Sequence, residues 1–166
     1  SISIVGESRE HCVVIGGLMM NGKKEDDVNV SNLTLRGSNG DGVCGNNGAS
    51  FHLDNVSVEN SGSNGVSVYG TKRNSMKNCN VSHSKESGLF VGNGGLMTID
   101  GNGTTIHHNG TGGYGHYGLH ANSSCSIHLA SSLTIETISK NHGVGRNYGG
   151  GGTFKTLYSN ACTLTY

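Results

Sequence analysis

One pattern recurs at a fixed distance along the chain, in Asn32-Leu33-Thr34-Leu35, Asn55-Val56-Ser57-Val58 and Asn78-Cys79-Asn80-Val81. The leading asparagines stand at 32, 55 and 78, so the period is 23 residues. Ten residues after each asparagine comes a glycine followed by an apolar residue, in Gly42-Val43, Gly65-Val66 and Gly88-Leu89. A third strip precedes each asparagine, as in Phe51-His52-Leu53. Self-similarity at a fixed period of this length indicates a repeat architecture.

Each repeat therefore holds three short strips in which apolar and polar residues alternate, as in β-strands with one buried face. Turns rich in Gly, Asn and Ser separate the strips, and no segment shows a helical apolar period. We predict an all-β parallel β-helix of about six 23-residue coils with three short strands per coil. Residues 1–166 form a single domain in this prediction, and its first coil runs from Ile2 to Ile15.

The later coils are stretched relative to this period. Thr104-Thr105-Ile106 comes two residues late, and Gly118 follows Gly88 by 30 residues, which indicates a longer loop over 109–117. The pattern then returns in Leu133-Thr134-Ile135 and Gly143-Val144. We expect the third strand of that coil at 133–135 and the next coil to begin at Gly143.

The composition excludes several classes of protein. The chain has 11 basic and 11 acidic side chains, whereas a nucleic-acid partner requires a clustered positive field. No apolar run approaches the roughly 20 residues that span a bilayer. The 29 glycines follow no Gly-X-Y period, which excludes collagen. We therefore expect neither nucleic acid nor a membrane as a partner.

The repeat resembles the right-handed parallel β-helix superfamily of pectate lyases, pectinesterases and polygalacturonases. Asn32, Asn55 and Asn78 match its asparagine ladder, in which an inward asparagine bonds the same residue of the next coil. The opening over residues 4–17 is similar to its first coil. The resemblance implies a right-handed helix with sugars bound on the outward row of the first strand. The chain is also similar to β-helix repeats of marine algae and their large viruses, a resemblance that implies no activity.

Most catalytic groups of those enzymes are missing. The chain has no Gln and no Trp, which pectinesterases use, and the first-strand row holds no acid cluster for a lyase. Asn39-Gly40-Asp41-Gly42 and Asn141-His142-Gly143 are similar to polygalacturonase motifs but fall on the turns of the repeat. We predict no catalytic residues and no cofactor. The alternative is a polysaccharide lyase, hydrolase or epimerase whose site lies around Asp41, Glu86, His116, His120 or His142.

The sequence favours a binding surface over a catalytic site. The predicted outward row of the first strand reads Cys44, Ser67, Phe90, His120 and Gly145, and the longer loop brings His116 and Tyr117 beside it. Insertions in a regular repeat tend to lie on its binding face. We predict that Phe90, His116, Tyr117 and His120 form an aromatic platform for a sugar ring. The competing interpretation is a Gly-rich loop with incidental aromatic residues.

Histidine and cysteine do not form recognisable metal or disulfide motifs. The chain has nine His and five Cys, but no His-x-His or Cys-x-x-Cys spacing. A metal centre requires three or four converging ligands. We therefore expect no metal site, and the odd, irregular cysteines indicate no disulfide framework.

The ends of the predicted stack lack a recognisable cap, although terminal coils expose unpaired strand edges. Two interpretations stay open: the chain is part of a longer protein, or its ends dock onto other protein chains. The function we predict is a non-enzymatic structural or recognition module of a surface assembly, associated with a virion or a cell wall. It would contact polysaccharide or other protein chains, and its location would be a virion or extracellular surface.

Overall fold

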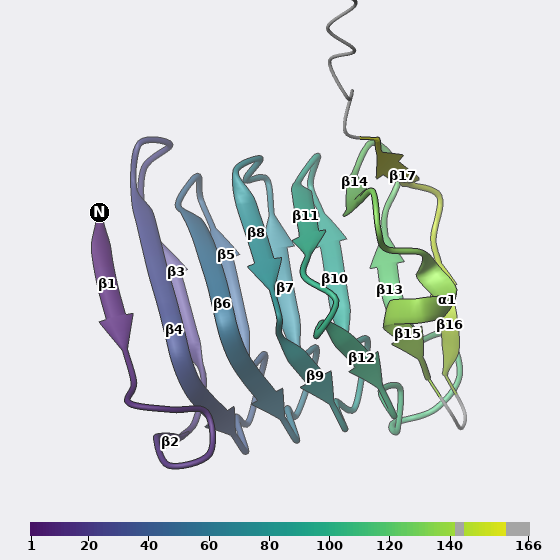
Figure 1. Cartoon of the computed structure of the whole chain (residues 1–166). Coiled ribbons are helices and arrows are strands. Elements are labelled where there is room, and N and C mark those ends of the chain that lie inside the picture. The colour runs from purple at the N-terminus through teal and green to yellow at the C-terminus, as the bar shows by residue number, and fades with distance from the viewer. Residues whose placement is uncertain (142–144, 159–166) are drawn as a thin grey trace, which may run out of the picture.

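The computed structural model describes residues 1–141 and 145–158, whose strands lie side by side in one long stack (Figure 1). Every strand pair is parallel, and the partners are one coil apart in the sequence. β1 (Ile2–Val5) stands at one end of the stack and α1 (Ile135–Ile138) lies at the other. The predicted parallel β-helix with a 23-residue period is therefore confirmed. In the described residues no helix is long and apolar enough to cross a membrane.

The strands form three faces. The first face is a six-stranded sheet of β3 (Leu18–Asn21), β5 (Val43–Asn46), β7 (Val66–Tyr69), β10 (Leu89–Gly92), β13 (Tyr117–Ala121) and β16 (Arg146–Gly149). The second face consists of β1, the first half of β4 (Asp27–Arg36), the first half of β6 (Ser50–Glu59), β8 (Asn74–Lys77), β11 (Leu96–Asp100), β14 (Ser126–Ala130) and β17 (Thr153–Leu157). The third consists of β2 (Val13–Ile15), the second halves of β4 and β6, β9 (Asn80–Ser82), β12 (Thr105–His107) and β15 (Ser139–Lys140).

The repeated asparagines form the turn between the second and third faces. Asn32, Asn55 and Asn78 have φ angles of 55°, 54° and 51°, a left-handed conformation that Asn tolerates better than most residues. The Asn55 Nδ2 atom donates to Asn32 Oδ1 at 2.9 Å, as a ladder requires. Asn78 Oδ1 instead accepts from the Gly103 amide at 3.3 Å, because the next coil is two residues longer. All three side chains are half-buried rather than fully inward.

The core is a narrow column of inward side chains that stack from coil to coil. Val43, Val66, Leu89 and Leu119 are successive partners on the first face, and each is fully buried. Each coil thus covers the apolar residues of its neighbours, which is how repeat proteins build a continuous core. A chain with only 33% hydrophobic residues can fold in this way.

Two predicted positions near the end of the described chain are wrong. Residues 133–135 do not form the third strand, because Thr134 caps helix α1 through a capping box with Thr137. The third-face strand is β15, which pairs with β12. On the first face, Gly149 rather than Gly145 lies opposite His120, because the strand begins at Arg146. The predicted start of this coil, with His142, Gly143 and Val144, lies outside the described residues.

Candidate functional site

The first face presents an outward row of side chains that are in register from coil to coil. Cys44 pairs with Ser67, Ser67 with Phe90, and Phe90 with His120. Parallel pairing in register places such residues about 4.8 Å apart, so the row is continuous. The sequence correctly predicted these four positions.

Four rings meet along this row, and we call Tyr69, Phe90, Tyr117 and His120 the aromatic strip. The Tyr69 and Phe90 ring centroids are 5.5 Å apart. Phe90 and His120 meet edge to face at 5.1 Å, and Tyr117 meets His120 edge to face at 4.9 Å. Edge-to-face pairs at this separation are favourable for aromatic side chains. The strip therefore joins three consecutive coils into one surface of rings.

Two glycines make room for the rings. A Cβ atom on Gly149 would collide with the ring of Tyr117. A Cβ atom on Gly92 would lie 2.8 Å from Cε1 of Phe90 and 3.4 Å from Cδ1 of Tyr69. The distance to Phe90 is too short for a carbon–carbon contact, and the distance to Tyr69 is an ordinary contact. The aromatic rings consequently pack close to the backbone of the strand rather than stand away from it.

Two ionisable groups of the strip, His120 and Tyr69, are held in their uncharged forms. Burial lowers the pKa of His120, the charge of His116 lowers it further, and a hydrogen bond with Asn122 opposes both. Burial raises the pKa of the Tyr69 phenol, and the carboxylate of Asp41 raises it again. At neutral pH His120 is therefore a neutral imidazole and Tyr69 a neutral phenol.

His116 is the predicted site residue that stands apart from the strip. Among the described residues it makes no ring contact with the other three predicted ones, and its backbone oxygen accepts from the Arg146 amide at 3.3 Å. His116 affects the strip electrostatically, because it lowers the pKa of His120. Phe90, Tyr117 and His120 thus come together, while His116 stands beside them.

The two carboxylates of the alternative site serve the turns of the helix. Asp41 Oδ1 accepts from the Asn64 backbone amide at 3.0 Å and from its side chain at 3.3 Å. Glu86 Oε2 accepts from Ser63 Oγ at 2.9 Å, one coil earlier. Each carboxylate therefore bonds a turn residue of the adjoining coil, and the two carboxylates bond different turn residues.

Asp41 also influences the N-terminal part of the outward row. With Met19 and Cys44 it lines a small cavity of about 250 Å³ on this face. Burial, assisted by the nearby Asp41 carboxylate, raises the pKa of the Cys44 thiol to about 11. A thiol with this pKa is protonated at neutral pH and is not an activated nucleophile.

Two further cavities lie away from the strip. One of about 380 Å³ opens at the end of the stack, among Ile2, Ile4, Leu18, Met20, Val28 and Ala49. The other, of about 450 Å³, is a polar recess on the third face, lined by residues that include Arg9, Thr34, Arg36, Ser57, Asn80 and Thr105. Neither recess contains a residue of the aromatic strip.

The cysteines of the described chain are free thiols, at Cys12, Cys44, Cys79 and Cys125, and Cys162 lies outside the described residues. Over residues 1–141 and 145–158, no group of three or more His, Cys, Asp and Glu side chains is placed to hold a metal ion.

The stacked coils and their period find a counterpart among known families. Residues 16–162 match the family described as the right-handed beta helix region. The chain belongs to this family. Membership in the right-handed beta-helix family gives the handedness of the coil and no activity. None of the curated proteins and none of the solved structures compared with it matches the chain. Its placement in an algal or algal-virus branch stays a prediction.

The sequence missed Tyr69 as a member of this site. Tyr69 lies two residues after Ser67, so it faces outward on the same strand, and it pairs with Gly92. The signal was the small residue in the next coil, since a glycine beside an outward tyrosine leaves space for the rings of both Tyr69 and Phe90.

Proposed function

We propose that this right-handed beta-helix protein is a non-enzymatic recognition module that binds neutral carbohydrate on its aromatic strip. The observation that carries the proposal is the run of ring contacts from Tyr69 through Phe90 and His120 to Tyr117. Aromatic side chains with a polar edge are suited to partners that are apolar on one side and wet on the other. The faces of a sugar ring have this character.

The charge of the strip supports an uncharged ligand. His120 and Tyr69 are both shifted toward their neutral forms, and Asp41 contributes a negative charge on the same face. A polyuronide would bring carboxylates toward this negative charge, which is unfavourable. Neutral oligosaccharides are therefore the ligand class that the strip fits best.

Binding of neutral oligosaccharides on a glycan array, followed by titration calorimetry of the best ligand, tests this proposal. We expect Tyr117→Ala to weaken binding about ten-fold, which corresponds to a lost aromatic contact of about 1.4 kcal/mol. Tyr114, which is almost fully exposed in the same loop, is the matched control, and Tyr114→Ala should bind normally.

An enzyme that acts on polysaccharide is the second candidate, favoured by the cavity that Asp41 lines beside the row. Incubation with pectin and alginate, followed by absorbance of unsaturated products, distinguishes the two. If the chain cleaves either polymer and Asp41→Asn abolishes the cleavage, the protein is a lyase and the recognition proposal is wrong.

We propose further that the end of the stack docks onto a parallel β-coil of another protein chain, as part of a surface assembly on a virion or a cell wall. In the described chain β1 and β2 pair with β4 alone, and β3 ends the first-face sheet. The outer edges of β1, β2 and β3 lie beside an apolar cavity. A parallel β-coil of another chain can pair with all three edges, because an unpaired strand edge can form hydrogen bonds with a further strand. Sedimentation velocity should detect self-association or binding of a β-helix partner, and Ile4→Lys should prevent it. A chain that stays monomeric at all concentrations and binds no β-helix partner would contradict this docking.

A further inference from the structure

A pair of histidines at the edge of the third face brings two ring nitrogens close together. His107 ends strand β12 and His108 follows it in a left-handed conformation with φ of 53°. Successive residues of a strand point to opposite faces, and the left-handed residue breaks this alternation. As a result, the Nδ1 atoms of His107 and His108 are 2.8 Å apart. Both imidazoles are accessible, since His108 is exposed and His107 half-buried.

A chain of hydrogen bonds from β6 sets which nitrogen of His107 carries the proton. Arg36 forms an ion pair with Glu59 at 2.9 Å, so Glu59 is an anionic acceptor. Ser57 therefore donates its hydroxyl proton to Glu59 Oε1 at 2.8 Å. Because that proton is used, Ser57 Oγ accepts from Asn80 at 3.0 Å, which identifies the donating atom as the amide nitrogen.

The orientation of the Asn80 amide then decides the tautomer of His107. Asn80 Oδ1 accepts from Thr105 Oγ1 at 3.0 Å, and His107 Nε2 lies 2.9 Å from the same oxygen. An amide oxygen has no proton to give, so Nε2 of His107 carries the hydrogen. In the neutral ring Nδ1 consequently keeps its lone pair, directed toward His108. A hydrogen bond from the second ring nitrogen to a carbonyl is the arrangement that orients histidine ligands of metals.

The spacing of the two nitrogens suits a metal with neighbouring ligands at right angles. With metal–nitrogen bonds of 2.0–2.1 Å, the edge between such ligands is about 2.9 Å, against about 3.3 Å in a tetrahedron. Rotation of the exposed His108 ring about χ2 turns its Nδ1 lone pair toward the metal position, while His107 keeps its hydrogen bond to Asn80. His83 stacks on His108 with centroids 5.3 Å apart and planes at 4°, which restricts how that ring moves.

We propose that His107 and His108 bind a divalent transition metal ion through their Nδ1 atoms, with Cu(II) the preferred ion. Tetragonal geometry and nitrogen ligands favour Cu(II), which is also the strongest binder of the divalent series. Of the described side chains, His107 and His108 supply two nitrogen ligands, and water completes the coordination. On binding, the proton between the two Nδ1 atoms leaves to solvent while the His108 ring takes up a proton at Nε2, so both ligands are neutral imidazoles, and the metal bonds replace the hydrogen bond. This inference is independent of the sugar-binding proposal, since the aromatic strip lies on the first face.

Titration of the full chain with Cu(II), observed by calorimetry and electron paramagnetic resonance, tests the site. We expect one tightest-binding ion per chain, with hyperfine coupling to two imidazole nitrogens. His107→Gln and His108→Asn should each weaken this binding at least about ten-fold, and asparagine tolerates the left-handed position. Asn80→Ala should weaken it about ten-fold although Asn80 is not a ligand, because the His107 tautomer is released.

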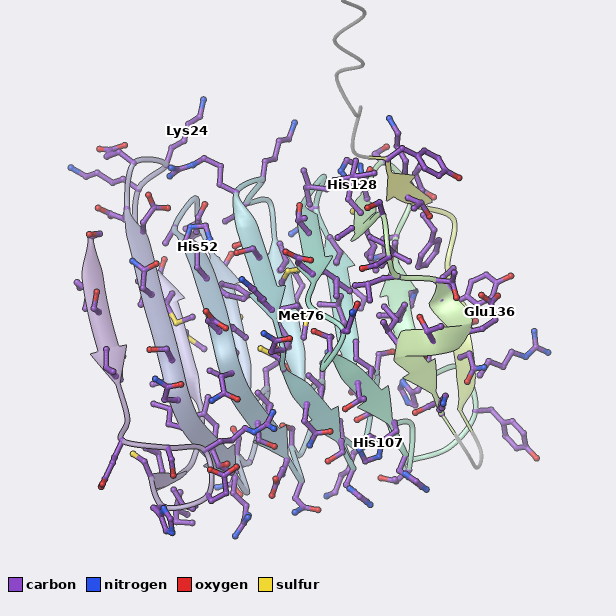
Figure 2. The ribbon with its side chains drawn as sticks, viewed as in Figure 1. Lys24, His52, Met76, His107, His128 and Glu136 are labelled. Atoms are coloured by element: carbon purple, nitrogen blue, oxygen red, sulfur yellow. The ribbon has the colours of Figure 1, made fainter. Side chains whose placement is uncertain are left out.

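His128 is the matched control, because it lies at the opposite edge of the stack from His107 (Figure 2). His128→Asn should leave the affinity for Cu(II) unchanged. NMR of the imidazole groups in the unmodified chain adds a test that requires no substitution, so misfolding of a variant cannot affect its result. It should show the Nε2–H tautomer of His107 and selective broadening of His107 and His108 by substoichiometric Cu(II). Equal broadening of His128, or unchanged affinity in the His107→Gln/His108→Asn double variant, would overturn the proposal.

Discussion

Asn55 donates a hydrogen bond from Nδ2 to Oδ1 of Asn32, the residue at the same turn of the preceding coil, over 2.9 Å. Both residues have left-handed backbones. One residue type thus serves two purposes, since asparagine tolerates the turn conformation and links it to its neighbour.

These two contributions of Asn55 can be measured separately. Asn55→Gly keeps the left-handed turn and loses the hydrogen bond, which should cost about 1 kcal/mol of unfolding free energy. Asn55→Ala loses the bond and also strains the backbone, so we expect a cost of about 2–3 kcal/mol. Urea unfolding monitored by circular dichroism measures both. Equal losses in the two variants would show that the backbone conformation contributes nothing.

Glycine at the start of each first-face strand is required by close packing between coils. A Cβ atom on Gly65 would collide with Val81 and lie 2.7 Å from the Gly88 carbonyl oxygen, which cannot move aside easily. We expect Gly65→Ala to destabilise the fold by about 1–3 kcal/mol in thermal or urea unfolding. Gly40→Ala is the control, because nothing lies within 4 Å of its added Cβ atom. That substitution should leave stability unchanged or raise it by roughly 0.5 kcal/mol.

Gly149 should affect the aromatic strip more than the fold. The three atoms nearest to an added Cβ atom all belong to the ring of Tyr117, the movable end of a side chain. Gly149→Ala should therefore displace that ring, change the near-ultraviolet circular dichroism and weaken sugar binding about as much as Tyr117→Ala. The melting temperature should change little. An unaltered near-ultraviolet spectrum, with sugar binding retained, would show that the ring is not held against Gly149.

The Cys44 thiol should resist alkylation until strongly alkaline pH. Burial and Asp41 raise its pKa to about 11, whereas an ordinary cysteine ionises near 8.5. Iodoacetamide labelling followed by peptide mass spectrometry should give a midpoint near pH 11 for Cys44 in the folded chain. Asp41→Asn should lower this midpoint and leave that of Cys79 unchanged, since burial is the first cause for Cys79.

The same shift has a consequence for stability. Between the ordinary cysteine pKa and about 11, the unfolded chain has lost the thiol proton that the folded chain keeps. Stability then falls as the pH rises through this range. Cys44→Ala should therefore lose less unfolding free energy than the unmodified chain as the pH rises toward about 11. The same dependence of stability on pH in both proteins would show that the Cys44 thiol does not have a raised pKa.

Much of the architecture could be predicted because each coil repeats the same local requirements. The repeat correctly placed the outward partners Cys44, Ser67, Phe90 and His120, although His120 follows Phe90 by 30 residues rather than 23. The pattern failed at Thr134, where a threonine that fits the strand column instead caps a short helix. A capping box depends on one hydroxyl and one amide nearby in sequence, so it can override a weak apolar period.

The sequence alone determined the coil, its period and the faces of its strands, because left-handed turns and alternating apolar residues are local requirements. Only the tertiary structure decided which side chains meet. Tyr69 joins Phe90 through the space beside Gly92, and His107 meets His108 because one left-handed residue turns its ring sideways. These contacts depend on packing between residues in space and on single φ angles, which a repeat pattern does not encode.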